Sequence, residues 1–167
     1  GAGDDTLVLG AYVNTVTVSN VETIVGAASS DTVVLGAATT RGNIDLGGGA
    51  DKLTLAAGGG TVTVSNVETI VGATAADLVT LGSAAAGISV DLGAGLDKLV
   101  LGSFANTLTV SNVETITGGA STDLVTLGAQ ATRGTFDLGG GADKLVLGAF
   151  VNTVTVTNVE TIIGGST

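Results

Sequence analysis

The sequence predicts an all-β fold, a right-handed parallel β-solenoid of about seven coils, on three observations. The motif Asn-Val-Glu-Thr-Ile returns every 46 residues, starting at Asn20, Asn66, Asn112 and Asn158. The segments between its copies alternate apolar and polar residues and are rich in Val and Thr, as strands with one buried face are. The apolar residues are almost all aliphatic, with no Met or Trp and only 2% aromatic residues, which suits a regular, repeating cross-section.

The repeat favours a solenoid over the alternative, an antiparallel β-domain that arose by internal duplication. In a solenoid, equivalent strands stack ~4.8 Å apart, so that like residues form columns along the stack. A sandwich does not require its strands to be copies of one another. The repeat units are residues 1–46, 47–92, 93–138 and, in part, 139–167, and together they form a single domain over 1–167.

Each unit is predicted to contain two unequal coils. Seven segments begin with Asp and continue with the same apolar strand pattern, and the spacing between them alternates between 26 and 20 residues. The leading residues are Asp5, Asp31, Asp51, Asp77, Asp97, Asp123 and Asp143. If each segment is the first strand of a coil, the unit is a 26-residue coil with three strands followed by a 20-residue coil with two. Leu7 and Leu9 then point inward, and Thr6 and Val8 point outward.

Composition excludes several classes of function. The chain carries 15 acidic and 5 basic residues, a net charge of −10, so it offers no basic patch to nucleic acid. Polar residues and glycines interrupt every apolar run well before the ~18 residues of a membrane span. There is no His or Cys, and a column of identical carboxylates lacks the two different environments that a catalytic pair requires. We therefore expect no enzymatic activity, no nucleic-acid partner and no membrane span.

Glycine-rich turns precede four of the Asp-led strands and resemble the RTX (hemolysin-type) nonapeptide repeat. The segments 1–7, 47–53, 93–99 and 139–145 all read Gly-x-Gly-x-Asp-x-Leu. The resemblance implies Ca²⁺ between successive turns, with candidate ligands Asp5, Asp51, Asp97, Asp143, Gly49, Gly95 and Gly141. The turns before the other three Asp-led strands lack the glycines, so half of each expected site is incomplete. No cofactor is otherwise required. The Asn-Val-Glu-Thr-Ile segments are similar to stretches that accompany such repeats in large secreted bacterial surface-layer proteins and adhesins.

The stacked Asp column needs something to offset its charge. Neighbours ~4.8 Å apart repel by ~1 kcal/mol in water and by ~3.5 kcal/mol at an effective dielectric of 20. Ca²⁺ could bridge the column, or each Asp could cap its own turn. Lys52, Lys98 and Lys144 could also lie between the carboxylates. The Asn column of the repeated motif is expected to form a hydrogen-bonded corner ladder, and its Glu column is expected to be a solvated edge.

Two outward faces suggest what the solenoid contacts. Apolar residues on the Asp-led strands predict an interface with another solenoid, and the candidates are Val8, Val34, Leu78, Val100, Leu124 and Val146. The second face carries Thr pairs such as Thr15 and Thr17, which resemble the flat Thr arrays of ice-binding solenoids. Asp residues expected on alternate coils, such as Asp45, should disrupt such an array.

These observations together predict an extracellular or cell-surface structural module of a secreted bacterial protein. We expect it to form a fibre, surface layer or adhesin stalk, either by self-association or as part of a longer chain with further repeats. A Ca²⁺-dependent RTX-type folding or secretion module is the alternative, and ice binding is a lesser one. The absence of an initiator Met and of a signal peptide suggests an excised or processed segment.

Overall fold

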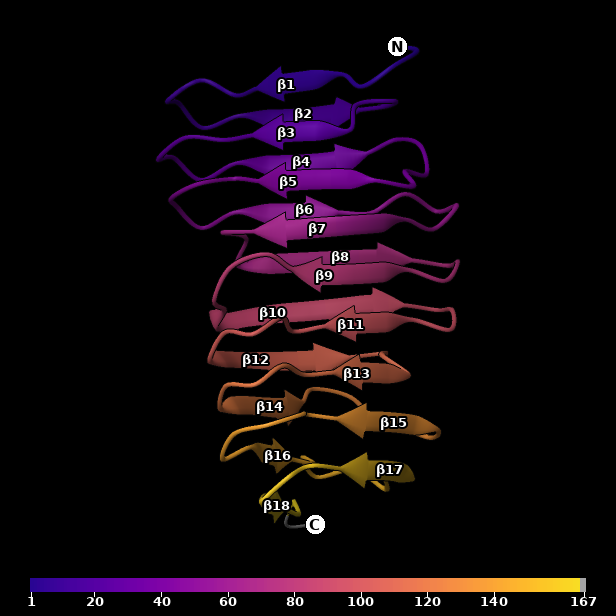
Figure 1. Cartoon of the computed structure of the whole chain (residues 1–167). Helices are drawn as coiled ribbons and strands as arrows, with labels where there is room; N and C mark the ends of the chain where they lie inside the picture. The colour runs from indigo at the N-terminus through magenta and orange to yellow at the C-terminus, as the bar shows by residue number, and fades with distance from the viewer. Residues whose placement is uncertain (166–167) are drawn as a thin grey trace.

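The computed structural model describes residues 1–165 and is built from two parallel β-sheets that lie face to face (Figure 1). Sheet A contains the odd-numbered strands β1 to β17, and sheet B contains the even-numbered strands β2 to β18. The strands of sheet A are β1 (Thr6–Val8), β3 (Thr23–Val25), β5 (Gly42–Asp45), β7 (Thr61–Ser65), β9 (Leu78–Leu81), β11 (Lys98–Val100), β13 (Thr115–Thr117), β15 (Gly134–Asp137) and β17 (Val154–Thr157). The strands of sheet B are β2 (Thr15–Val18), β4 (Thr32–Leu35), β6 (Lys52–Thr54), β8 (Thr69–Ala73), β10 (Ala86–Gly93), β12 (Asn106–Ser111), β14 (Asp123–Leu127), β16 (Lys144–Val146) and β18 (Thr161–Ile163).

Each turn of the chain contributes one strand to each sheet, so the predicted parallel β-solenoid is confirmed. Every internal strand pairs in parallel with the strand one turn before and one turn after it, and the first and last strands, β1 and β18, lie at opposite ends of the stack (Figure 1). A turn takes 17 or 20 residues, as the pairing of Thr6 with Thr23 and of Thr23 with Asn43 shows. Nine strands in each sheet correspond to about eight turns, one more than predicted.

The 46-residue unit spans five strands, and the predicted division into 26- and 20-residue coils is wrong. The first unit runs from β1 to β5 and the second from β6 to β10. Because five strands are two and a half turns, each unit begins on the opposite sheet from the one before. The Asp-led strands therefore do not stack as one column. Sheet A contains β1, β9 and β11, and sheet B contains β4, β6, β14 and β16.

The core is a column of aliphatic side chains between the sheets. The predicted alternation holds in β1, where Val8 is 68% exposed on the outer face while Leu9 directly after the strand is buried. Leu53, Leu99 and Leu145, which occupy the same place in successive units, are all fully buried. Phe136 is also fully buried, and it takes the inward place that Ile44 has in the first unit. Outward positions carry Thr, Ser, Lys and Asp among scattered apolar residues, which is the pattern of strands with one solvated face.

The corners depend on residues that tolerate a left-handed backbone. Asn20, Asn66, Asn112 and Asn158 all have φ between 53 and 54°, a conformation that Asn tolerates far better than most residues. Gly47 has φ +85°, and a Cβ there would lie 2.0 Å from the carbonyl oxygen of Ala27 in the preceding turn. Only glycine allows the two turns to approach so closely.

Engineered disulfides test the five-strand unit directly, because the chain has no cysteine of its own. Lys98 and Thr115 are paired neighbours on the outside of β11 and β13, so the double variant Lys98→Cys/Thr115→Cys should form a disulfide under mild oxidation. Lys52 and Lys98 occupy equivalent places in successive units but lie on opposite sheets, so Lys52→Cys/Lys98→Cys should stay reduced. Non-reducing electrophoresis and intact-mass measurement distinguish the two. Cross-linking of the second pair instead would contradict the half-turn alternation.

Candidate functional site

Polar residues at the corners before four neighbouring strands of one sheet are joined by hydrogen bonds into a ladder. On sheet B it consists of Asn14, Asp31, Asp51 and Glu68, which lead into β2, β4, β6 and β8. The backbone N–H of Asn14 donates to Oδ1 of Asp31 at 2.8 Å. The N–H of Asp31 donates to Oδ1 of Asp51 at 2.6 Å, and that of Asp51 donates to Oε2 of Glu68 at 2.7 Å. Each rung thus supplies the acceptor for the N–H of the rung before it.

The ladder recurs once per unit and changes sheets with it. The second ladder, on sheet A, consists of Gly60, Asp77, Asp97 and Glu114. The third ladder, on sheet B, consists of Asn106, Asp123, Asp143 and Glu160. Its N–H bonds are 3.0, 2.7 and 2.6 Å long. An uncharged residue separates two ladders on the same sheet and is called a spacer here. Ala85 is the spacer between the first and third ladders, and its N–H donates to Oδ1 of Asn106 at 3.0 Å.

The ladder exists because these corner N–H groups face the interior. Parallel strand pairing begins only with the next residue, so the corner N–H would otherwise be buried without a partner. A short side chain with an oxygen acceptor on the following turn satisfies it. Of the three explanations for the Asp residues, backbone capping is the one the geometry shows, but the five that cap do so on the preceding turn instead of their own: Asp31, Asp51, Asp97, Asp123 and Asp143. Lys52 and Lys98 are exposed, and within residues 1–165 the only ion pair joins the Gly1 amino group to Asp5.

Burial of the ladder Asp carboxylates is nearly complete, whereas the ladder Glu residues are partly or fully exposed. Asp123 is fully buried, and Asp51 and Asp97 are 1% exposed. Only Oδ1 of each has a hydrogen-bond partner, and Oδ2 has none. Loss of solvation therefore raises the pKa of Asp51, Asp97 and Asp123. The neighbouring carboxylate of Glu114 raises the pKa of Asp97 further.

Asp77 differs from the other ladder residues because the head of its ladder is glycine. In the third ladder, Asn106 donates both its N–H and its Nδ2 to Oδ1 of Asp123, at 3.0 and 2.8 Å. Gly60 occupies the same place before Asp77 and has no side-chain amide to offer, and neither carboxylate oxygen of Asp77 has a hydrogen-bond partner. Burial raises the pKa of Asp77 as well.

A second polar contact closes the opposite corner of each unit. Oδ1 of Asp45 accepts the N–H of Gly47 at 3.1 Å and the side-chain amide of Asn66, one turn later, at 2.7 Å. The same pair of bonds recurs at Asp91 and Asp137. Asn66, Asn112 and Asn158 of the repeated motif therefore bond to Asp and do not form the predicted Asn ladder. The Glu residues of that motif are partly or fully exposed, as predicted for a solvated edge, but each also accepts the N–H of an Asp through Oε2 and so ends a carboxylate ladder.

The structure separates the candidate Ca²⁺ ligands. Asp5 and Asp97 precede strands of sheet A, while Asp51 and Asp143 precede strands of sheet B. Gly49, Gly95 and Gly141 lie in the turns before Asp51, Asp97 and Asp143 and separate in the same way. No three acidic side chains in the described part of the chain converge as a metal site requires. The carboxylates that lie next to each other along a sheet belong to neighbouring ladder residues, such as Asp31 and Asp51. The resemblance to RTX repeats did not predict these pairs.

The predicted outer faces are divided between the two sheets. Val8, Leu78 and Val100 lie on sheet A, whereas Val34, Leu124 and Val146 lie on sheet B, so they form no continuous apolar strip. The Thr pairs are divided in the same way. Thr15 and Thr17 lie on sheet B, and the equivalent pair of the next unit, Thr61 and Thr63, lies on sheet A. An Asp such as Asp45 or Asp137 stands on every fifth strand of sheet A instead of every second.

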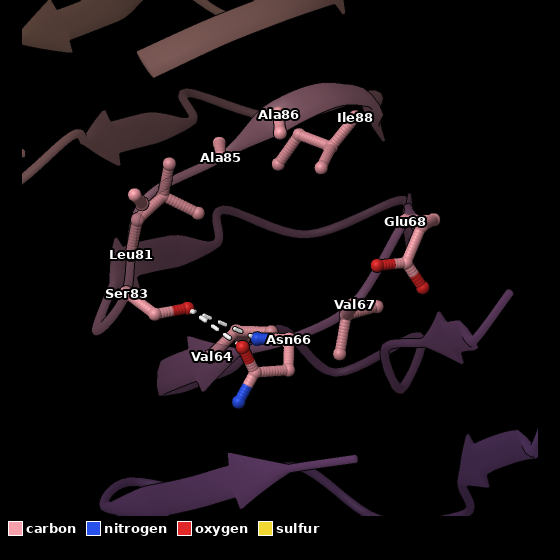
Figure 2. Close-up of a pocket in the computed structure, with 10 residues that line it drawn as sticks. Val64, Asn66, Val67, Glu68, Leu81, Ser83, Ala85, Ala86 and Ile88 are labelled. Carbon is pink, nitrogen blue, oxygen red and sulfur yellow. Dashed lines mark hydrogen bonds between the residues drawn. The ribbon is translucent and has the colours of Figure 1, made fainter. Parts of the chain in front are cut away.

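Two shallow hollows occur at equivalent places of successive units, next to the uncharged spacers. The larger, about 230 Å³, lies between the corner at Asn66–Glu68 and the segment Leu81–Ile88. Figure 2 shows Asn66 and Ser83 joined by hydrogen bonds at one end of it and Glu68 at the other. The second, about 130 Å³, is lined by the residues 46 positions later, among them Asn112 and Glu114. The recurrence indicates that the hollows follow from the repeat.

Comparisons of the chain with protein-family models, with curated proteins and with solved structures found no match. Among residues 1–165 there is also no helix with the length and apolar character to cross a membrane. The solenoid fold therefore stands on the strand pairing alone, and no family is identified.

The buried ladders predict a protein that becomes more stable on mild acidification. Four carboxyl groups, Asp51, Asp77, Asp97 and Asp123, have raised pKa values in the folded chain. The folded state therefore binds more protons than the unfolded state, and the free energy of unfolding falls as the pH rises through the folded pKa values. Lowering the pH from 7 toward about 4, the pKa of an unfolded Asp, should raise the Tm in a scan by calorimetry or circular dichroism.

Substitution of one ladder carboxylate provides the control. Asp51→Asn keeps an acceptor for the N–H of Asp31 but cannot ionise, so the rise in Tm between pH 7 and 4 should be smaller in this variant. A shift of one pKa unit in one group corresponds to about 1.4 kcal/mol, or about 3–6 °C for a chain of this length. A Tm that falls steadily over this range in the unsubstituted protein would rule out the proton uptake.

The glycine at the head of the second ladder allows a gain in stability to be predicted. Gly60 does not have a positive φ, and a Cβ there would meet only Asp77 and Thr39, at ordinary contact distances of 3.7 Å or more. Gly60→Asn should therefore donate to Asp77 and raise the free energy of unfolding by about 1–3 kcal/mol in urea denaturation. Asn106→Gly, the matched variant, should lower it by a similar amount. Equal stabilities of the two variants would show that the head amide contributes nothing.

Proposed function

We propose that the chain is an extracellular structural repeat module whose coils stack end to end in a fibre, surface layer or adhesin stalk. The supporting observation is that each internal coil is held between two coils of the same kind, with parallel pairing from strand to strand through both sheets of the described stack. The strand edges that such a stack presents are templates for pairing with another strand.

A fibre, a surface layer or an adhesin stalk is the assembly that such a module suits. Two of its hollows recur with the repeat, as features of a repeated structural unit do. A net charge of −10 favours solubility of an extended surface and opposes binding to nucleic acid. The likeness of its glycine-rich turns to secreted RTX repeats supports an extracellular or cell-surface location. Lateral packing would have to use both sheets, because the apolar outward residues are divided between them.

Mass photometry and negative-stain imaging over a concentration series test the proposal. We expect linear particles whose mass and length rise in steps of one chain, in EDTA as well as in Ca²⁺. Short, monodisperse rods at every concentration would count against end-to-end assembly. Particles or a folded state that appear only with Ca²⁺, with a large rise in Tm by mass action, would favour the Ca²⁺-dependent module instead.

A further inference from the structure

We infer that a third hollow, at the corner where Asp77 is buried, binds a small flat apolar compound that carries a carboxamide. The hollow has a volume of about 360 Å³ and lies at the corners that lead into β7 and β9 of sheet A. This volume is within the range of small-molecule sites. Binding of such a compound is a property separate from the stacking of coils and does not depend on it.

The second unit departs from the repeat at this hollow. Residues 58–60, which line it, are all glycine. The equivalent corners of the other units carry an aromatic residue and then, two positions later, Asn. These pairs are Tyr12 and Asn14, Phe104 and Asn106, and Phe150 and Asn152. Leu96 also lines the hollow, and the equivalent positions one unit before and one unit after it are Ala50 and Ala142. Two departures from the repeat therefore meet at one place.

The Asn at the head of a complete ladder joins two turns through its carboxamide. Oδ1 of Asn106 accepts the N–H of the spacer Ala85 at 3.0 Å, and its Nδ2 donates to Oδ1 of Asp123 at 2.8 Å. One carboxamide thus satisfies a backbone donor on one side and a buried carboxylate on the other.

Gly60 leaves the same two positions without a carboxamide. Thr39 and Asp77 hold the places that Ala85 and Asp123 hold in the third ladder. Asp77 is 3% exposed, and neither of its carboxylate oxygens has a hydrogen-bond partner among residues 1–165. A Cβ at Gly60 would lie 3.7 Å from Oδ1 of Asp77 and 3.7 Å from the carbonyl oxygen of Thr39, so a group placed there is close to both turns.

A carboxamide matches this pair of groups because it has both an N–H₂ donor and an oxygen acceptor. Its N–H₂ group would donate to Asp77, and its oxygen would accept the N–H of Thr39. A buried polar group without a partner is costly, so supplying the partner favours binding. A carboxylate of the same shape has no N–H donor and carries the same charge as ionised Asp77, so it should be rejected.

The walls of the hollow favour an apolar group next to the carboxamide. Leu96 is 81% exposed and lines the hollow together with Leu78 and Ala76. A ring that covers Leu96 removes apolar surface from water, which favours binding. Lys98 lines the hollow as well, but it is exposed, so salt and solvent screen its charge.

Titration of the ¹⁵N-labelled protein with benzamide tests the site by NMR. We expect saturable shifts of the amide signals of residues 58–60 and Asp77, with a dissociation constant on the order of 1 mM for a compound of this size. The signals of Asn106 and Asp123 should not move. Acetamide, which lacks the ring, and benzoate, which lacks the N–H donor, should each bind at least about tenfold more weakly. Equal binding of benzoate, or shifts spread over all units, would contradict the inference.

Two substitutions that restore the residues of other units test the two walls separately. Gly60→Asn fills the place of the carboxamide and should abolish the benzamide-induced shift of Asp77. Because this variant is expected to be more stable than the unsubstituted protein, its loss of binding cannot result from unfolding. Leu96→Ala should raise the dissociation constant by about threefold or more, with an unchanged Tm because Leu96 is exposed. Benzamide binding that survives Gly60→Asn would overturn the inference.

A gain of binding provides the reciprocal test. The double variant Phe104→Gly/Asn106→Gly copies the corner of the second unit next to Asp123, and a melting curve should show that it is folded. Benzamide should then also shift the signal of Asp123, with lower affinity because Ala142 stands where the second unit's site has Leu96. An Asp123 signal that stays unmoved in the folded variant would show that the missing carboxamide does not create the site.

Discussion

Apart from the Glu corners, where the backbone carbonyl of an Asp one turn earlier accepts the N–H, most turns of this solenoid have to provide an acceptor for a backbone N–H that faces the interior at the corner before a strand. Sheet pairing cannot supply it, because the paired segment begins one residue later, at Thr32 after Asp31 for example. A side-chain oxygen from the next turn supplies it instead, with the bond of 2.6 Å between the N–H of Asp31 and Asp51 as the shortest case in the first ladder. An unpaired buried N–H costs about 1–3 kcal/mol, a cost that recurs at each turn and favours an acidic or amide residue at nearly every such corner.

The odd number of strands in the repeat decides how these acids are distributed. Because five strands are two and a half turns, a ladder on sheet B is followed by one on sheet A, and each ladder contains only three carboxylates. Uncharged spacers such as Ala85 and Ala131 then interrupt the sequence of acids on each sheet. A single column of seven carboxylates would place five of the charges beside two others. The half-turn offset instead limits each run to three, which reduces the repulsion between buried like charges.

Much of the fold could be predicted from the sequence, whereas the connections between turns could not. Alternation in segments such as Thr6 to Leu9 reports which side chain faces the core, and the structure confirms it. The 46-residue period does not reveal how many strands it contains, so Asp5 and Asp31 were predicted to stack although they lie on opposite sheets. Asn14, Asn106 and Asn152 share the period and were a detectable signal, but Gly60 interrupts their column. The role of Glu68 depends on a contact 17 residues away, which no local pattern encodes.

A fold held together in this way can be lengthened without limit, and that property connects its chemistry to its proposed role. The N–H of Asp31 is satisfied by Oδ1 of Asp51 on the next turn, and that of Asp51 by Oε2 of Glu68 on the turn after it. A globular enzyme closes its core once, whereas a ladder transfers the same requirement from turn to turn. Each coil is thereby recognised at one corner, because only a turn that presents a ladder residue there accepts the N–H of the turn before it.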